Sequence, residues 1–255
     1  MNSPVDLSIV IPAYNEASRL PGTLERVRDW VERKRAAMGM QIEVLVVDDG
    51  SRDPTAEVVR LWIARFAGLR LVSNPGNRGK GYSVRHGMLE SRGTIALFTD
   101  ADLSAPIGEA DKLLDALERA DVAIGSRALD RSLIETHQSA AREFAGRLFN
   151  GFVRLITGVR FLDTQCGFKA FRMGRARPIF EQQRIEDFGF DPELLFLARR
   201  HGLKAVEVPV RWAHDPASKI RMGRDSLRMF WDLVQVRWNA IAGRYPRAPG
   251  YRSGR

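Results

Sequence analysis

The sequence predicts an α/β fold built on a mainly parallel sheet, because short apolar runs alternate with longer segments of helical periodicity. The apolar runs are rich in β-branched residues, which is typical of buried strands; they occupy residues 7–11, 42–47, 69–73, 94–99 and 122–125. The predicted helices occupy residues 17–38, 54–66, 82–91 and 108–119. Alternation of this kind indicates parallel strands joined by right-handed helical crossovers.

The alternation ends near residue 130. Beyond it we expect strands at residues 168–172 and 205–210 and helices at residues 139–157 and 191–201. A final helix over residues 224–242 is amphipathic, with an apolar face that comprises Leu227, Phe230, Trp231, Val234, Trp238 and Ile241 and a polar face that includes Asp232 and Asn239. We therefore expect a domain of residues 1–223, an amphipathic helix suited to a membrane surface at residues 224–243, and a flexible tail at residues 244–255.

Basic residues are concentrated at the C-terminal end. Residues 211–255 contain ten Lys or Arg residues and three Asp residues, so this segment carries most of the formal charge of +9. A near-neutral body with a basic end favours contact with phosphates or an anionic membrane over uniform nucleic-acid binding. The single cysteine, Cys166, excludes an intrachain disulfide framework. We expect neither a signal peptide nor a membrane-spanning helix.

Polar residues follow the predicted strands where each strand ends. They lie at residues 12–16, 48–51, 77–81 and 100–102. In an open parallel sheet these ends meet at one edge, where ligands bind. Carboxylates gathered there would repel one another without a cation between them. The pattern therefore predicts a divalent metal that is bound together with a diphosphate.

Several other kinds of site are not indicated. The first strand is not followed by G-x-G-x-x-G, and residues 76–81 lack the spacing of a P-loop. The four histidines show no metal-ligand spacing, and no G-x-S-x-G motif occurs. Dinucleotide, P-loop and serine-hydrolase chemistry are therefore disfavoured.

The motifs together resemble family 2 glycosyltransferases of the GT-A fold, and within them the dolichyl- or polyprenyl-phosphate glucosyltransferases. The segments that carry the resemblance are SIVIPAYNE, VVDDGSRD, NRGKGYSVRHGM, FTDADLS, IGSRA, DTQCGFKAFR and FDPELLFLARR. The segment DTQCGFKAF is far more specific than the D-x-D of residues 100–102. The resemblance implies that residues 1–223 form a GT-A catalytic domain with a Rossmann-like sheet.

The resemblance also implies which residues bind the nucleotide sugar. They are Pro12, Tyr14, Asn15, Glu16, Asp48 or Asp49, Arg78, Lys80, Asp100 and Asp102. Asp100 and Asp102 would hold Mg²⁺ or Mn²⁺, and Asp102 would be essential for catalysis. Three of these residues have a simpler alternative: Asn15 could cap the first helix, Asp49 could serve a turn, and Lys80 could be solvated.

On the acceptor side the candidates are Asp163 and Asp191. An alcohol acceptor needs a general base, whereas a phosphomonoester is already largely anionic near neutral pH. With a phosphate acceptor we expect Asp163 to orient groups or balance charge, and Asp191 could instead be the N-cap of a helix that starts at Pro192. The candidates for acceptor-phosphate binding are Arg127, Lys219, Arg221 and Arg224; the last three could also contact an anionic membrane or simply be solvated.

The resemblance implies an inverting transfer of glucose from UDP-glucose to a dolichyl or polyprenyl phosphate, by a peripheral protein on the cytoplasmic face of a membrane. Three alternatives remain: GDP-mannose as the donor, a soluble acceptor, or a non-enzymatic module that binds membranes or nucleic acid. The acidic strand ends argue against nucleic acid, and we expect no nucleic-acid partner.

Overall fold

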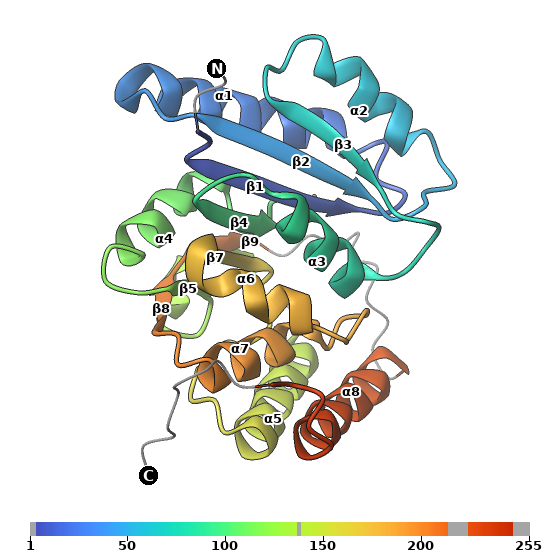
Figure 1. Ribbon diagram of the computed structural model, residues 1–255, viewed down its shortest axis with the longest axis vertical. Coiled ribbons are helices and arrows are strands. Elements are labelled where there is room, and N and C mark those ends of the chain that lie inside the picture. The colour runs from blue at the N-terminus through green and yellow to red at the C-terminus, as the bar shows by residue number, and fades with distance from the viewer. Residues whose placement is uncertain (1–3, 137–138, 214–223, 247–255) are drawn as a thin grey trace.

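A seven-stranded sheet forms the centre of the computed structural model, which describes residues 4–136, 139–213 and 224–246 (Figure 1). The strand order is β3-β2-β1-β4-β7-β5-β8. The strands are β1 (Leu7–Ala13), β2 (Ile42–Asp48), β3 (Leu69–Ser73), β4 (Ile95–Thr99), β5 (Val122–Ser126), β7 (Phe168–Arg172) and β8 (Ala205–Pro209). Only β7 among these runs antiparallel to its neighbours, β4 and β5, so the expected mainly parallel sheet is confirmed.

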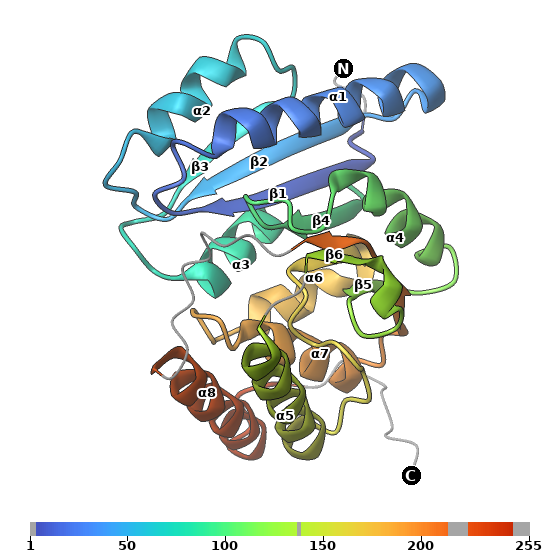
Figure 2. The ribbon, with the colours of Figure 1, turned by 180° about the vertical axis from the view of Figure 1, so that it is seen from behind.

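Helices cover both faces of the sheet. They are α1 (Leu20–Met38), α2 (Thr55–Ile63), α3 (Lys80–Glu90), α4 (Ala110–Ala116), α5 (Ala140–Thr157), α6 (Met173–Gln182), α7 (Phe190–Arg200) and α8 (Arg224–Ile241). Two 3₁₀ turns, Ile107–Glu109 and Arg131–Leu133, and a small sheet of β6 (Ile134–Thr136) and β9 (Trp212–Ala213) complete the described elements. Figure 2 shows α1, α2 and α4 on one face, and Figure 1 shows α3 and α6 on the other.

Alternate residues of the central strands build two separate cores. Ile9 and Val44 pack into the core beneath α1, α2 and α4, whereas Val10 and Leu45 pack into the core beneath α3, α6 and α7. This period of two is that of a β-strand whose faces are both buried. It explains why the strands read as continuous apolar runs in the sequence.

Two elements of the second half differ from expectation. The strand at residues 168–172 is present, but its antiparallel direction was not predicted. Helix α6 was missed altogether. It contains Pro178, which disfavours a helix interior, and it forms nonetheless because Ala176, Ile179 and Phe180 are buried in the core.

Helices α5, α7 and α8 pack together at the end of the molecule opposite α1 and α2 (Figures 1 and 2). Helix α8 buries Leu233, Val236 and Asn239 and leaves Trp231 and Trp238 each 62% exposed. The burial of Asn239 corrects its predicted place on a solvent face. Its amide binds Tyr245, which is fully buried although the flexible tail was predicted to begin at residue 244.

Candidate active site

The loops that follow β1 and β2 are joined through Asn15. This residue has a positive φ of 53°, a conformation that asparagine tolerates better than most residues. Its backbone N–H donates to the Ser51 hydroxyl at 2.9 Å, and its side-chain oxygen accepts from the N–H of Arg52 at 2.8 Å. Asn15 therefore fixes the two strand ends relative to each other and does not cap α1, whose N-cap is Arg19.

Asp49 organises the Gly-rich loop of residues 76–81, which we call the donor loop. Its carboxylate accepts hydrogen bonds from the backbone N–H groups of Arg78 and Gly79, at 2.9 and 2.8 Å, and from the Asn74 side chain at 2.7 Å. These contacts give Asp49 the structural role that was its alternative, namely holding the loop; its contact with the nucleotide stays a prediction. Asp48, the other candidate, accepts the turn N–H of Ser51 at 3.1 Å.

The donor loop reaches the end of β4 through Lys80. The Lys80 ammonium lies 2.5 Å from Oδ1 of Asp100, so Lys80 is not simply solvated. Burial would lower the pKa of Lys80, but the charges of Asp100 and Asp191 outweigh it and the pKa is raised. Burial, with the charge of Asp100, raises the pKa of Asp102. The acidic strand end and the basic loop thus meet as predicted.

Gly167, from the DTQCGFK segment, packs directly against Asp100. A Cβ placed on this glycine would lie 2.8 Å from Cγ of Asp100 and still closer to Oδ2. No side chain fits there without moving the carboxylate. The glycine of the specific motif is therefore part of the site at the end of β4.

Asp163 forms a bidentate ion pair with Arg127. The guanidinium donates to both carboxylate oxygens at 2.6 and 2.8 Å, and the backbone N–H of Arg127 adds a third bond at 3.0 Å. Burial alone would raise the pKa of Asp163, but the charge of Arg127 dominates and lowers it. Arg127 also lies over the ring of Trp212, 5.3 Å from its centroid. Arg127, the candidate for acceptor-phosphate binding, and Asp163, the acceptor-side carboxylate, are thus partners of each other.

Asp191 pairs with Lys169 inside the protein. The Lys169 side chain is fully buried, and its ammonium contacts Asp191 and donates to the backbone oxygen of Cys166 at 2.6 Å. Burial raises the pKa of Asp191 despite this partner. The alternative role of Asp191 as an N-cap is wrong, because α7 begins at Phe190 and its N-cap is Gly189.

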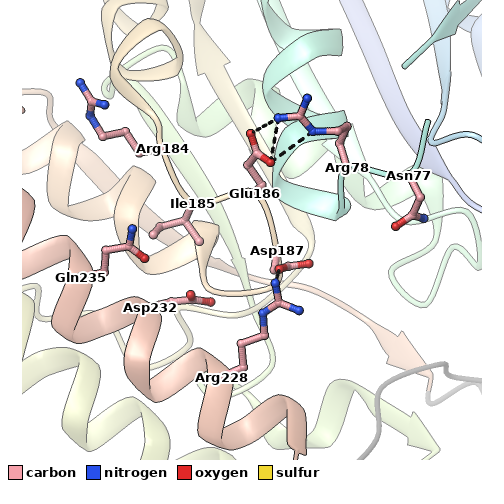
Figure 3. A pocket seen from close by; sticks show the side chains of 9 residues that line it. All are labelled: Asn77, Arg78, Arg184, Ile185, Glu186, Asp187, Arg228, Asp232 and Gln235. Atoms are coloured by element: carbon pink, nitrogen blue, oxygen red, sulfur yellow. Dashed lines mark hydrogen bonds and ion pairs between the residues drawn. The ribbon is translucent and has the colours of Figure 1, made fainter. Parts of the chain in front are cut away.

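The side chain of Arg78 extends from the donor loop toward α8. It forms an ion pair with Glu186 at 2.8 Å and lies over the ring of Tyr82. Figure 3 shows this pair at the edge of a pocket of about 390 Å³. Helix α8 contributes Arg228, Asp232 and Gln235 to the same pocket. The binding of Arg78 to the nucleotide sugar stays a prediction.

Asp100 and Asp102 fit a divalent cation that a substrate helps to hold. Carboxylate oxygens are the ligands that Mg²⁺ and Mn²⁺ prefer, and Mg²⁺ usually takes one or two of them beside phosphate oxygens and water. Residues 4–136, 139–213 and 224–246 contain no group of three or more His, Cys, Asp or Glu that could hold a metal by itself. Burial and the charge of Asp100 raise the pKa of Asp102. The same crowding of carboxylates in a partly buried place is the reason to expect a cation there.

The remaining predicted residues have varied positions. Pro12 lies on β1, and Glu16 pairs with Arg19 at 2.5 Å; Tyr14 lies between them in the loop after β1. Lys219 and Arg221 fall outside the described residues, and Arg224 is the first residue of α8. Cys166 is buried, and burial raises the pKa of its thiol to about 12, as expected for a residue that only packs.

Sequence reasoning assigned no role to Lys169 and did not find Glu186. A signal for Lys169 was present, because it lies between Phe168 and Ala170 in a strand of buried residues. A lysine in such a place requires a carboxylate partner. Glu186 carries no comparable signal, since it is a partly exposed residue of a loop.

Comparison with known proteins places the chain among glycosyltransferases. The sequence model of glycosyl transferase family 2 matches residues 8–180. A dolichyl-phosphate beta-glucosyltransferase of Drosophila melanogaster is 39% identical over 245 residues, covering 89% of this chain and 74% of that protein. The corresponding enzyme of Saccharomyces cerevisiae is 34% identical over 260 residues, with coverages of 94% and 76%.

Solved structures share the fold at low sequence identity. Glucosyl-3-phosphoglycerate synthase of Mycobacterium tuberculosis matches with a TM-score of 0.62 at 19% identity, over 91% of this chain and 80% of that one. A mannosyltransferase of Pyrobaculum calidifontis, solved with GDP-mannose and Mn²⁺, matches with a TM-score of 0.56 at 21% identity, over 94% and 66%. These likenesses confirm the expected GT-A architecture.

Proposed function

The chain belongs to glycosyl transferase family 2 and is a glycosyltransferase, and from this membership we propose that it transfers glucose from UDP-glucose to the phosphate of a dolichol or another polyprenol. The sugar and the acceptor are those in the names of its relatives, which match about nine-tenths of the chain. UDP-glucose is the donor we infer from the resemblance of the motifs.

One observation about the site favours a phosphate acceptor. Both acceptor-side carboxylates are held by cations: Asp163 by Arg127 and Asp191 by Lys169. An alcohol acceptor would require a carboxylate or another base free to take its proton. A phosphomonoester, with a second pKa of about 6, brings an anionic oxygen that needs no such base. The paired carboxylates therefore suit a nucleophile that is already charged.

The proposed reaction is a single displacement. An oxygen of the acceptor phosphate attacks the anomeric carbon of glucose, the bond from that carbon to the UDP oxygen breaks, and the configuration inverts to β. The electron pair of the broken bond leaves on UDP. Lys80 lies where it can offset this charge once the diphosphate competes for its ammonium with Asp100. Arg127, held in orientation by Asp163, is the candidate for receiving the acceptor phosphate.

Asp100 and Asp102 would hold Mg²⁺ or Mn²⁺ beside Lys80. The metal would supply further positive charge for the leaving diphosphate. Support for a metal comes from the two carboxylates themselves and from the fold neighbour that was solved with Mn²⁺. The choice between the two cations is part of the test.

We also propose that the protein docks peripherally on the cytoplasmic face of a membrane, because a polyprenyl phosphate resides in one. None of the described helices has the length and hydrophobicity needed to cross a bilayer. Neighbouring helices instead expose large apolar side chains: Phe144, Leu148 and Leu155 on α5 and Trp231, Trp238 and Ile241 on α8. Exposed arginines accompany them on both helices, at positions 147, 154, 228 and 237. Apolar and basic side chains together suit an anionic lipid surface.

The test is transfer of labelled glucose from UDP-glucose to a short polyprenyl phosphate in the presence of Mg²⁺ or Mn²⁺. We expect labelled lipid with the wild-type protein and none with Asp102→Ala, while Asp115→Ala, which removes an exposed carboxylate of α4, retains turnover. GDP-mannose serves as the competing donor. Preferential transfer of mannose would replace the proposed donor, and full turnover by Asp102→Ala would refute the metal site.

A further inference from the structure

The segment of residues 183–187, between α6 and α7, forms the wall on which the donor loop rests. The N–H of Tyr82 donates to the backbone oxygen of Glu186 at 3.0 Å, and the Gln183 amide donates to the backbone oxygen of Gly81 at 2.8 Å. A Cβ on Gly81 would lie 2.6 Å from the backbone oxygen of Ile185. The contact is thus backbone against backbone, and movement of this wall would move Lys80, which lies between Gly79 and Gly81 of the loop.

Glu193 of α7 holds this wall from inside the protein. It is fully buried, and its carboxylate accepts the backbone N–H groups of Arg184 at 2.8 Å and Ile185 at 2.9 Å. Because a hydrogen bond to a charged group is stronger than one to a neutral group, the wall is tied to a rigid helix at its centre.

The C-terminal segment completes the arrangement through Tyr245. The Tyr245 hydroxyl donates to Oε1 of Glu193 at 2.5 Å and accepts from the Asn239 amide of α8 at 3.2 Å. Its backbone oxygen accepts from the side chain of Arg200 at 2.7 Å. On the open side, Arg228 of α8 pairs with Asp187, as Figure 3 shows across the pocket. Helix α8 therefore contacts the wall directly at Asp187, through Arg228, and indirectly through Asn239, Tyr245 and Glu193.

We propose that Glu193 and Tyr245 are positioning residues for the donor site: through the 183–187 wall they set the place of the donor loop and of Lys80. The C-terminal segment is then part of the donor-binding apparatus as well as a candidate membrane surface. The inference rests on the proposed function insofar as the donor loop is taken to bind the nucleotide sugar. Both residues are fully buried, so they act on the donor's affinity through the wall and not by contact.

The charge of Glu193 gives the proposal a pH signature. Burial raises the pKa of Glu193 to about 7, although the hydrogen bonds from Tyr245 and the two backbone amides oppose this shift. The charge of Asp232 on α8 raises the pKa of Glu193 further, whereas the charge of Arg184 beside the wall acts on Tyr245, where it opposes the rise of that pKa. Protonation of Glu193 weakens its oxygens as acceptors for the backbone N–H groups of Arg184 and Ile185. We therefore expect donor binding to weaken as the pH falls through 7.

The experiment measures the dissociation constant of UDP-glucose by calorimetry for the full chain at pH 6.5 and pH 8. UDP-glucose suits it because its diphosphate is esterified at both ends and does not titrate in this range. Tyr245→Phe removes one hydrogen bond to the carboxylate, so we expect about fivefold to tenfold weaker binding at pH 6.5. The loss should shrink at pH 8, where Glu193 regains its charge. Glu193→Gln should be weak at both values.

Phe196→Leu is the matched control. The ring of Phe196 packs 6.1 Å from that of Tyr245, so this variant reduces the packing but keeps the hydroxyl, and it should lower the melting temperature without changing donor affinity. Hydrogen exchange without ligand gives a second readout, since Tyr245→Phe should speed exchange at residues 78–82. Equal donor affinity and equal exchange in the wild type and Tyr245→Phe would overturn the inference alone. A wild-type protein that binds neither UDP-glucose nor GDP-mannose would overturn the proposed function and the inference with it.

Discussion

The Asp100 carboxylate occupies the space that a Cβ on residue 167 would need, so only glycine fits at this position. The glycine comes from the loop before β7 and the aspartate from the end of β4, two antiparallel neighbours of the sheet. Because Asp100 also binds Lys80 at 2.5 Å, the backbone at residue 167 controls how the donor loop meets the strand end. This relationship explains why the DTQCGFK segment is more informative than the aspartates alone.

Gly167→Ala should therefore reduce turnover with little loss of fold. The new Cβ pushes the Asp100 carboxylate away from Lys80, and a displacement near 1 Å can cost on the order of a hundredfold in rate. Gly174→Ala is the control, since a Cβ there meets nothing within 4 Å. Steady-state kinetics of both variants test the point; equal rates would show that Asp100 tolerates the shift.

Asp163→Asn should destabilise the protein because it leaves the partly buried Arg127 guanidinium without its anion. We expect a loss of about 3 kcal/mol in the free energy of unfolding at pH 7. The pKa of Asp163 is lowered, so its contribution is present above the ordinary value of 3.8 and is lost as the pH falls below it. Denaturant unfolding from pH 7 to pH 3 should show the gap between wild type and variant closing only below about pH 4. A gap that closes already near pH 6 would contradict this.

Lys169→Met should cost more than its volume suggests, because Asp191 is then buried alone. Breaking a buried pair from one side costs about 3–5 kcal/mol, whereas replacing both partners with apolar residues is often nearly neutral. The double variant Lys169→Met/Asp191→Leu should thus be more stable than Lys169→Met. The melting temperatures of Lys169→Met, Asp191→Leu and the double variant test this prediction. If the losses of the two single variants simply add up in the double variant, Lys169 and Asp191 are not energetically coupled.

Leu155→Ala on α5 should weaken binding to vesicles that contain anionic lipid. The side chain is 80% exposed beside α8, so its loss should not affect the fold. Leu61→Ala on α2 is matched, being 69% exposed at the other end of the molecule (Figure 1). Co-sedimentation should separate the two variants by about tenfold to fiftyfold in affinity, as expected for the loss of two to three membrane-buried methylene-sized groups at about 0.8 kcal/mol each. Identical binding of both would remove α5 from the membrane surface.

The sequence predicts local structure well where one principle acts alone. The buried strand β2 occupies residues 42–48, one residue longer than the predicted 42–47, because a β-branched apolar run has few other stable structures. Helix α6 was missed because Pro178 and Gly174 lower its local propensity while burial of Phe180 sustains it. Packing between segments that are distant in the sequence decides whether such a helix forms, and a short stretch of sequence does not contain that information.

The same limit applies to the site. Asp163, Asp191 and Arg127 were each identified as candidates, yet their pairing was not predicted. The pair of Arg127 and Asp163 depends on β5 lying beside β7, an order that follows from the sheet topology and not from spacing along the chain. The ion pair of Arg78 was not predicted either, since its partner Glu186 lies 108 positions further along the chain.

The most direct test of the central claim compares two acceptors that differ in one group, a polyprenyl phosphate and the corresponding polyprenol. Both are offered with UDP-glucose and the metal, and the initial rate of lipid glucosylation is measured from pH 5.5 to pH 8. Because Asp163 and Asp191 are both ion-paired, we predict transfer to the phosphate alone, with a rate that rises through about pH 6 as the phosphate loses its second proton. Comparable transfer to the alcohol would mean that a base operates in this site, and it would contradict the claim that the enzyme depends on an acceptor that is already charged.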